Sequence, residues 1–242
     1  MTTFRRALVT GGSGGIGAAI CRRLAADGCE VVIHANTNLA AAEALAADIA
    51  AAGGRAMTIA FDVADAQASA AALAGLLAAG PVQVLVNNAG IHDDAVFPGM
   101  RPEQWHRVID VSLHGFFNVT QPLLLPMLRT RWGRIVSVTS VAGLIGNRGQ
   151  SNYAAAKGAL HAATKSLALE VATRGVTVNA VAPGIIATAM SEAAFDQEAI
   201  AKLVPMQRTG TPAEVADLVG FLCSDRAGYI TGQVISVNGG MA

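Results

Sequence analysis

The sequence predicts an α/β fold in which helices cover both faces of a doubly wound parallel sheet of about seven strands. Seven short runs of apolar, mostly β-branched residues recur along the chain, as is typical of strands that are covered on both faces. Alanine-rich stretches with helical patterns lie between most of them, and this alternation favours right-handed strand–helix–strand crossovers. Because no linker or low-complexity stretch interrupts the series, we expect residues 1–242 to form a single domain.

The expected elements follow one another along the chain as short strands and longer helices. The strands are expected at residues 7–9, 31–33, 57–59, 82–86, 135–138, 176–181 and 234–237. The helices are expected at residues 16–26, 39–52, 66–79, 102–129, 152–174 and 212–223. Pro122 and Pro126 lie in the fourth helix, which should kink or stop there because proline lacks a backbone N–H. Residues 190–210 show helical stretches with no strand behind them, so they are predicted to be a substrate lid.

The composition excludes several classes of function. Seventeen basic residues balance seventeen acidic ones, so no overall charge attracts nucleic acid or an anionic membrane surface. Only 14% of the residues are charged, against roughly 25% in an average soluble protein, and this scarcity predicts a homo-oligomer. The three cysteines form no CxxC pair, and neither a signal-peptide core nor a run of roughly 20 apolar residues is present. These features predict a cytoplasmic protein.

A glycine-rich turn follows the first expected strand and opens the first helix. Its sequence is Thr10-Gly11-Gly12-Ser13-Gly14-Gly15-Ile16-Gly17, which fits both GxGxxG and TGxxxGxG. In this context glycines let the backbone approach a pyrophosphate at a helix N-terminus, although a plain tight connection is the alternative. The predicted cofactor-binding residues of this turn are Gly11, Ser13, Gly14, Gly15, Ile16 and Gly17.

The end of the second strand indicates which dinucleotide is preferred. Enzymes that use NAD place an Asp or Glu roughly 20 residues after the glycines, where it accepts hydrogen bonds from the ribose. Here the residues are Asn36, Thr37 and Asn38, and no acidic residue follows before Glu43. Three small polar side chains leave room for a 2′-phosphate and can donate to it, so we expect NADP(H) to be favoured over NAD(H). No arginine lies in this loop to contact that phosphate.

Tyr153, Lys157 and Ser140 are the candidate catalytic residues. Tyr153 and Lys157 are four residues apart on an expected helix and so share one face. A nearby ammonium group lowers the pKa of a phenol, ordinarily about 10, and prepares it to exchange a proton. Ser140 ends the fifth expected strand, at the sheet edge where such folds bind ligands. A solvated helix face is the alternative interpretation of the Tyr–Lys pair alone.

These motifs together resemble the short-chain dehydrogenase/reductase family over essentially the whole chain. The glycine turn, Asn87-Asn88-Ala89-Gly90, Ser140, Tyr153-x-x-x-Lys157 and Pro183-Gly184 occur in the family's order. Two further stretches, at residues 183–190 and 229–240, are most similar to 3-oxoacyl-[acyl-carrier-protein] reductases. The resemblance implies a Rossmann-type fold, a homotetramer, and reduction of a 3-oxoacyl thioester, carried by an acyl carrier protein, with NADPH.

The resemblance also implies a role for each matching residue. Tyr153 would donate a proton to the substrate oxygen, Lys157 would hold the nicotinamide ribose, and Ser140 would bind the developing alkoxide. The remaining cofactor contacts that it implies are Asp62, Val63, Asn88, Ala89, Gly90, Pro183, Gly184, Ile186 and Thr188, in addition to Tyr153 and Lys157. Arg131 and Arg174 match the positions with which carrier-protein reductases dock their acidic partner, although a solvated charged face is the alternative.

One position departs from the family pattern. Ser112 stands where the family has an asparagine that anchors a water in a proton relay to the lysine, so the relay here needs a further water or is impaired. Two alternatives to the favoured function stay open: the same chemistry on another carbonyl or secondary alcohol, and a catalytically impaired regulatory subunit that binds nucleotide. The five histidines show neither HxxxH nor HxH spacing, so no metal site is expected.

Overall fold

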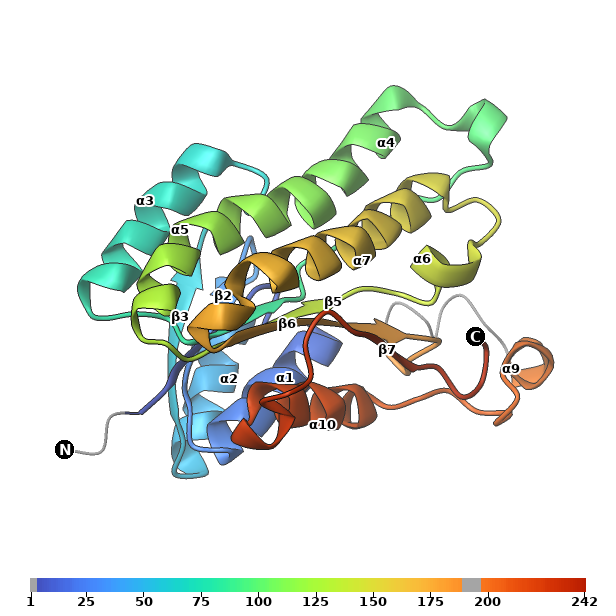
Figure 1. Ribbon diagram of the computed structural model, residues 1–242. Helices are drawn as coiled ribbons and strands as arrows, with labels where there is room; N and C mark the ends of the chain where they lie inside the picture. Colours follow the sequence, from blue (N-terminus) through green and yellow to red (C-terminus); the bar gives the residue numbers. More distant parts are fainter. Residues whose placement is uncertain (1–3, 189–196) are drawn as a thin grey trace.

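The computed structural model describes residues 4–188 and 197–242, within which seven parallel strands form one sheet. The strand order is β3-β2-β1-β4-β5-β6-β7, so the chain winds outward from β1 to one edge, returns, and winds to the other. The strands are β1 (Arg6–Val9), β2 (Glu30–Ala35), β3 (Arg55–Ala60), β4 (Val84–Asn87), β5 (Gly133–Val138), β6 (Val176–Pro183) and β7 (Val234–Val237). The predicted doubly wound α/β fold is confirmed (Figure 1).

Helices cover both faces of the sheet, as predicted. One face carries α1 (Gly15–Ala26), α2 (Leu39–Ala51) and α10 (Pro212–Cys223) (Figure 1). The other carries α3 (Ala66–Ala78), α4 (Pro102–Ile109), α5 (Gly115–Arg129) and α7 (Ser151–Val171). Side chains alternate between the two layers: in β1, Ala7 and Val9 pack with the first group of helices, whereas Leu8 packs with the second.

The two edge strands differ from the prediction of strands covered on both faces. β3 alternates between exposed and half-buried residues, and β7 is half-buried for most of its length. Each of these strands has a strand neighbour on one side only. The five strands between them are buried almost throughout, in keeping with sequences in which apolar residues predominate.

The long fourth helix does not stop at its prolines, so of the predicted kink or stop, the stop is wrong. α5 continues through Pro122 and Pro126 to Arg129, because Val119, Leu123 and Met127 lie fully buried on the sheet side and outweigh the missing backbone donors. The helical geometry changes earlier instead. A π-helical segment, η2 (Asp110–His114), lies between α4 and α5, and such segments are frequent at functional sites.

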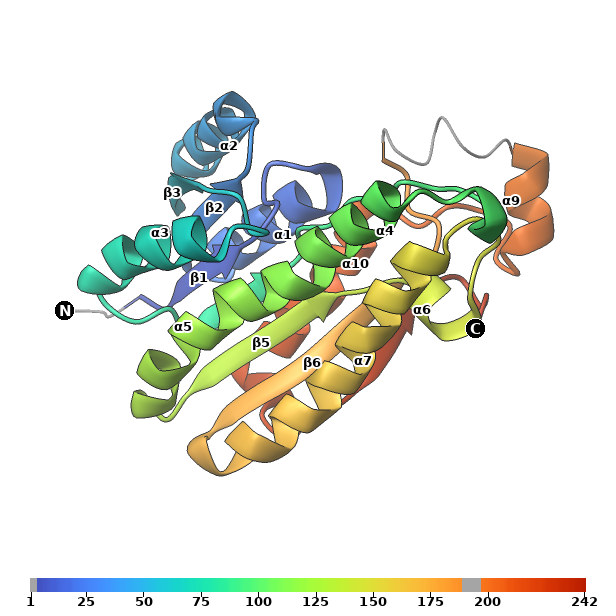
Figure 2. The same ribbon diagram turned by 90° about the horizontal axis from the view of Figure 1, so that it is seen from above.

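The lid segment is described from residue 197 onward, and residues 190–196 lie outside the described residues. It contains the helix α9 (Gln197–Leu203), which stands beyond the ends toward which β5 and β6 point (Figure 2). The short helix α6 (Ala142–Ile145) follows β5. The backbone N–H of Gly210 donates to Ile185 and that of Met206 to Gly239, at 2.9 and 3.1 Å. These bonds fix the base of the segment to the chain after β6 and β7.

The remaining elements are short 3₁₀ segments. They are η1 (Phe97–Gly99), η3 (Ala172–Arg174) and η4 (Asp225–Ala227). Among the residues that the structure describes, no helix is long and apolar enough to cross a membrane.

Candidate active site

The turn after β1 forms a glycine cradle at the start of α1. Gly11 has a φ of 61°, which glycine adopts without strain, and a side chain on Gly17 would collide with the carbonyl oxygen of Gly11. Gly14 and Gly15 are exposed. The N-terminus of α1 receives no side-chain cap and has no acidic residue in its first turn, so its N–H groups fit a pyrophosphate.

The side chain of Asn88 ties this turn to the end of β4. Its Nδ2 donates to the carbonyl oxygens of Thr10 and Gly11, at 2.9 and 3.0 Å. The hydroxyl of Thr10 accepts hydrogen bonds from the backbone N–H groups of Asn88 and Ala89, both at 3.0 Å. Part of the expected Asn-Asn-Ala-Gly motif therefore shapes the cradle and does not only line it.

Ser140, Tyr153 and Lys157 meet at the carboxyl edge of the sheet. Ser140 lies two residues beyond Val138, where β5 ends, so it follows the strand and does not terminate it as predicted. Its Oγ accepts a hydrogen bond from the backbone N–H of Ala142 at 3.1 Å. Tyr153 and Lys157 share one face of α7, and the Lys157 Nζ lies 5.5 Å from the centre of the tyrosine ring.

The pKa of Tyr153 is raised, contrary to the prediction that Lys157 would lower it. Burial of the phenol is the main cause; a hydrogen bond with Ser140 opposes it, and the carboxylate of Asp94 adds to it. Lys157 is not among the causes of this shift, although its Nζ lies 5.5 Å from the centre of the ring. The phenol is therefore held in its protonated form across neutral pH, the form that a proton donor needs.

Lys157 is buried, and its Nζ donates a hydrogen bond to the carbonyl oxygen of Val138, at 3.0 Å. Burial lowers the pKa of its ammonium group from about 10.5 to about 8. Gly90 leaves room beside it: a Cβ on Gly90 would stand 3.1 Å from the Lys157 Nζ and 3.7 Å from the Ser112 Oγ. Both polar atoms therefore border the same space.

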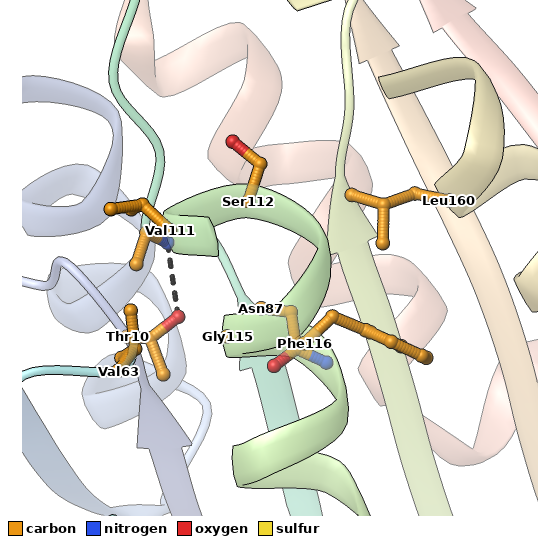
Figure 3. A pocket seen from close by; sticks show the side chains of 9 residues that line it. Thr10, Val63, Asn87, Val111, Ser112, Gly115, Phe116 and Leu160 are labelled. Carbon is orange, nitrogen blue, oxygen red and sulfur yellow. Dashed lines mark hydrogen bonds between the residues drawn. The ribbon is translucent and has the colours of Figure 1, made fainter. Parts of the chain in front are cut away.

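Ser112 lies in the π-helical segment and is buried, and its hydroxyl has no hydrogen-bond partner among the described residues. It lines a cavity of about 10 Å³ together with Thr10, Asn87 and Phe116 (Figure 3), which is room for about one water molecule. The Ser112 hydroxyl points away from Thr10 and Asn87 (Figure 3). The sequence contains no signal for this π-helical segment.

The structure brings most of the other predicted cofactor residues around the same edge. Asp62 is exposed and its carboxylate accepts from the N–H of Ala64, whereas Val63 is buried. A Cβ on Gly15 would stand 3.1 Å from the Thr188 Cγ2, so the chain after β6 approaches the glycine cradle. The other predicted cofactor residues differ in burial. Ser13, Ile16 and Gly184 are half-buried, Pro183 and Ile186 are buried, and Asn36, Thr37 and Asn38 are exposed.

Two buried histidines form contacts that the sequence analysis missed. The Nε2 of His161 lies 2.9 Å from the hydroxyl of Thr139, next to Ser140. His34 binds the glycine turn through Gly11. A sequence signal for His34 exists: a polar residue inside a strand buried on both faces must find a hydrogen-bond partner. Over residues 4–188 and 197–242, no group of three or more His, Cys, Asp or Glu side chains could hold a metal ion.

Arg131 and Arg174 lie apart from these residues. Both are exposed, and each lies two residues before the first residue of a strand, β5 for Arg131 and β6 for Arg174. The two arginines therefore lie at the amino edge of the sheet, whereas Ser140 lies at the carboxyl edge, just after the end of β5. The backbone places the two arginine loops side by side, since the N–H of Gly133 donates to the carbonyl of Gly175 at 3.3 Å.

Comparison with known proteins matches the chain to one family. The model of the short chain dehydrogenase family matches residues 5–199. The chain is 45% identical over 236 residues to the 3-oxoacyl-[acyl-carrier-protein] reductase FabG of Aggregatibacter actinomycetemcomitans, covering 97% of this chain and 98% of that protein. It is 46% identical over 241 residues to the 3-oxoacyl-[acyl-carrier-protein] reductase of Synechocystis sp., with 99% and 97% covered. It is also 45% identical over 238 residues to nodulation protein G of Azospirillum brasilense, with 97% of both covered.

Proposed function

The chain belongs to the short chain dehydrogenase family, and on that basis we propose that it reduces a 3-oxoacyl thioester to the 3-hydroxyacyl thioester with NADPH. Two relatives carry the name 3-oxoacyl-[acyl-carrier-protein] reductase at 45 and 46% identity over nearly their whole length. The observation that carries the proposal is the meeting of Ser140, Tyr153 and Lys157 beside the glycine cradle.

The reaction adds a hydride to the carbonyl carbon and a proton to its oxygen. Bound NADPH would supply the hydride. Tyr153 gives the proton, and its raised pKa suits this direction because the phenol stays protonated until the oxygen becomes basic. Ser140 donates a hydrogen bond to the oxygen as negative charge develops there. The buried Lys157, whose ammonium group donates to the carbonyl oxygen of Val138, would hold the nicotinamide ribose.

The preference for NADPH is supported by the residues after β2. Asn36, Thr37 and Asn38 are exposed, and no carboxylate stands among them to repel a 2′-phosphate. Asn38 already caps α2 by accepting from the N–H of Ala41 at 3.2 Å, yet its Nδ2 can still donate. The first turn of α2 carries no acidic residue, so the helix N-terminus adds a favourable field for an anion.

Ser112 is proposed to belong to the path that returns a proton to Tyr153. Its hydroxyl and the Lys157 Nζ border the space next to Gly90, and a water there would connect them. A serine is shorter than the asparagine of the family, so its hydroxyl reaches less far and needs this water to complete the path. The substitution therefore lengthens the relay by a water and does not remove it.

Arg131 and Arg174 are proposed to dock an acidic carrier protein. Because they lie at the opposite edge of the sheet from Ser140, the acyl arm of a carrier docked there would enter the active site of another subunit. The proposed homotetramer supplies that subunit. Large apolar side chains left exposed on the helix layer of α5 and α7, namely Phe117, Leu125 and Leu169, support such self-association.

We further propose that residues 1–242 form one domain, that residues 190–210 close over the substrate, and that the protein is cytoplasmic.

The test follows oxidation of NADPH with an acetoacetyl thioester as substrate. Tyr153→Phe should lower kcat at least about 100-fold, since it removes only the proton donor, while direct NADPH binding persists. Tyr229→Phe is the matched control, because Tyr229 is the other tyrosine of the chain and is fully exposed. If the protein binds NADPH but does not turn over the thioester, the proposed substrate is wrong. That result would favour another carbonyl substrate or a regulatory subunit.

A further inference from the structure

His34 is a buried polar residue inside an apolar strand, and it holds the glycine turn at two successive peptides. The backbone N–H of Gly11 donates to its Nδ1 at 3.0 Å. The backbone N–H of Gly12 donates to its carbonyl oxygen at 2.8 Å. The residue is 1% exposed, so no solvent competes for these bonds. The side chain and the backbone of one β2 residue thus hold two successive peptides of the turn, and only the bond to Gly11 depends on the imidazole.

The other ring nitrogen reaches a third segment. The Nε2 of His34 lies 2.8 Å from the carbonyl oxygen of Phe61, and the two rings pack 4.3 Å apart. Phe61 directly precedes Asp62 and Val63, which are proposed to face the adenine. The imidazole therefore spans the two segments between which the adenosine end of the dinucleotide would lie.

These partners determine the protonation state of the ring. Because Gly11 donates to Nδ1, this nitrogen carries no proton, and Nε2 must carry the proton that it donates to Phe61. A second proton on Nδ1 would face the N–H of Gly11 and break the bond to the turn. Burial lowers the pKa of His34, which keeps the ring neutral.

We propose that His34 is a positioning residue for the dinucleotide, in its neutral form with the proton on Nε2, and that it sets the spacing between the glycine cradle and residues 61–63. This inference rests on the proposed function, since it needs a dinucleotide in the cradle. His34 does not contact the reacting atoms, so it acts on cofactor affinity and not on the transfer of hydride or proton.

Few titratable groups face this ring. Asp62, at the end of β3, raises its pKa but does not outweigh burial. On the side of α1, the thiol of Cys21 lies 3.8 Å from the carbonyl of Gly12, and burial raises its pKa to about 12. The thiol of Cys21 therefore does not titrate between pH 5 and 8, and a change of affinity in that range that disappears on replacing residue 34 belongs to His34 itself.

The first experiment measures NADPH binding directly, by fluorescence, beside steady-state kinetics. His34→Leu keeps an apolar side chain of similar size but has no acceptor for Gly11, and it should raise Kd and KM for NADPH about tenfold with kcat nearly unchanged. His34→Gln, whose amide offers one acceptor and one donor, should recover part of the affinity. His161→Leu, at the other buried histidine bound to a hydroxyl, should leave the Kd for NADPH unchanged.

A second measurement uses the unmodified protein and holds even if His34→Leu does not fold. Affinity for NADH, which lacks the titrating 2′-phosphate, should fall as the pH drops below 6.5 toward the lowered pKa of His34, and His34→Gln should flatten this loss. Nitrogen NMR of the imidazole should show a proton on Nε2 only, down to below pH 6.5.

The outcomes separate the two proposals. If the wild-type protein binds neither NADPH nor NADH, both the proposed function and this inference fail. If it binds and turns over substrate but His34→Leu shows the same Kd, or the NMR shows a proton on Nδ1, the positioning role fails and the proposed function stands.

Discussion

Lys157 is bonded to Val138: its Nζ donates to the carbonyl oxygen at the end of β5, 3.0 Å away. Because Ser140 follows two residues later, this one bond fixes α7, and with it Tyr153, relative to the turn that carries Ser140. The bond also holds an ammonium group inside the protein, where no carboxylate among the described residues counters the effect of burial on its pKa. The lowered pKa of Lys157 is the measurable consequence.

The free energy of unfolding of the wild-type protein should rise between pH 8 and 10, and Lys157→Met should abolish this rise. The folded-state pKa is about 8 and the ordinary value about 10.5, so over this range the unfolded chain binds the proton and the folded one does not. Stability therefore increases as the pH rises, by about 3 kcal/mol in total. Urea unfolding at several pH values measures the free energy of unfolding of both proteins.

The difference between the two pH curves is the quantity to use, because the buried cysteines titrate in both proteins and act in the opposite direction. Parallel curves for the wild-type protein and Lys157→Met would mean that the ammonium of Lys157 is not destabilised by burial.

Gly17→Ala and Gly75→Ala should change stability in opposite directions. Both glycines lie inside helices, where alanine is favoured by roughly 0.5–1 kcal/mol. At Gly75 nothing lies within 4 Å of the new Cβ, so this gain should appear in full. At Gly17 the Cβ would collide with Gly11, so a loss of about 1–3 kcal/mol and weaker NADPH binding should result. Thermal unfolding checks both variants, and equal shifts would contradict the close packing of the turn.

The sheet and its order of elements were predictable because each buried strand and each helix carries its own local periodicity. The pairing of Tyr153 with Lys157 was also local, since four residues make one helical turn. The location of Arg131 and Arg174 could have been predicted too. Residues just before a strand lie at the opposite edge of a parallel sheet from residues just after it.

Other properties of the site depend on contacts between distant segments. The pKa of Tyr153 follows from burial and from Asp94, which is far away in sequence. The partners of His34 belong to the turn after β1 and to the segment that follows β3, and no periodicity in β2 specifies them. The uninterrupted course of α5 through Pro122 and Pro126 likewise depends on the burial of its sheet-facing side chains.

Ser112→Ala should stabilise the protein while slowing the reaction. Its buried hydroxyl has no partner among the described residues, so removing it should raise the free energy of unfolding by about 1 kcal/mol. If Ser112 relays a proton, kcat should fall about tenfold. Ser137→Ala is the matched control, because Ser137 in β5 has an equally buried and unpaired hydroxyl. An unchanged kcat for Ser112→Ala would remove Ser112 from the proton path.

Asn36→Asp should shift the cofactor preference from NADPH toward NADH. The change is isosteric and places a carboxylate directly after β2, where it would accept from a ribose hydroxyl and repel a 2′-phosphate. The ratio of kcat/KM for NADPH to that for NADH should fall at least about tenfold, while kcat at saturating cofactor stays the same. An unaltered ratio would show that the 2′-phosphate does not lie next to Asn36.

Replacing both Arg131 and Arg174 with glutamate should impair reduction of a carrier-bound substrate selectively. Both arginines are exposed and lie far from Ser140, so kcat and KM for a small thioester should be unchanged. With an acidic carrier protein, attraction becomes repulsion, and KM for the carrier-bound thioester should rise about tenfold or more. Arg22→Glu combined with Arg55→Glu makes the same change of charge at exposed positions on α1 and on the edge strand β3, and it should leave both substrates unaffected. Equal loss with both pairs would indicate a general effect of net charge, and no loss with Arg131 and Arg174 would leave these residues as part of a solvated surface.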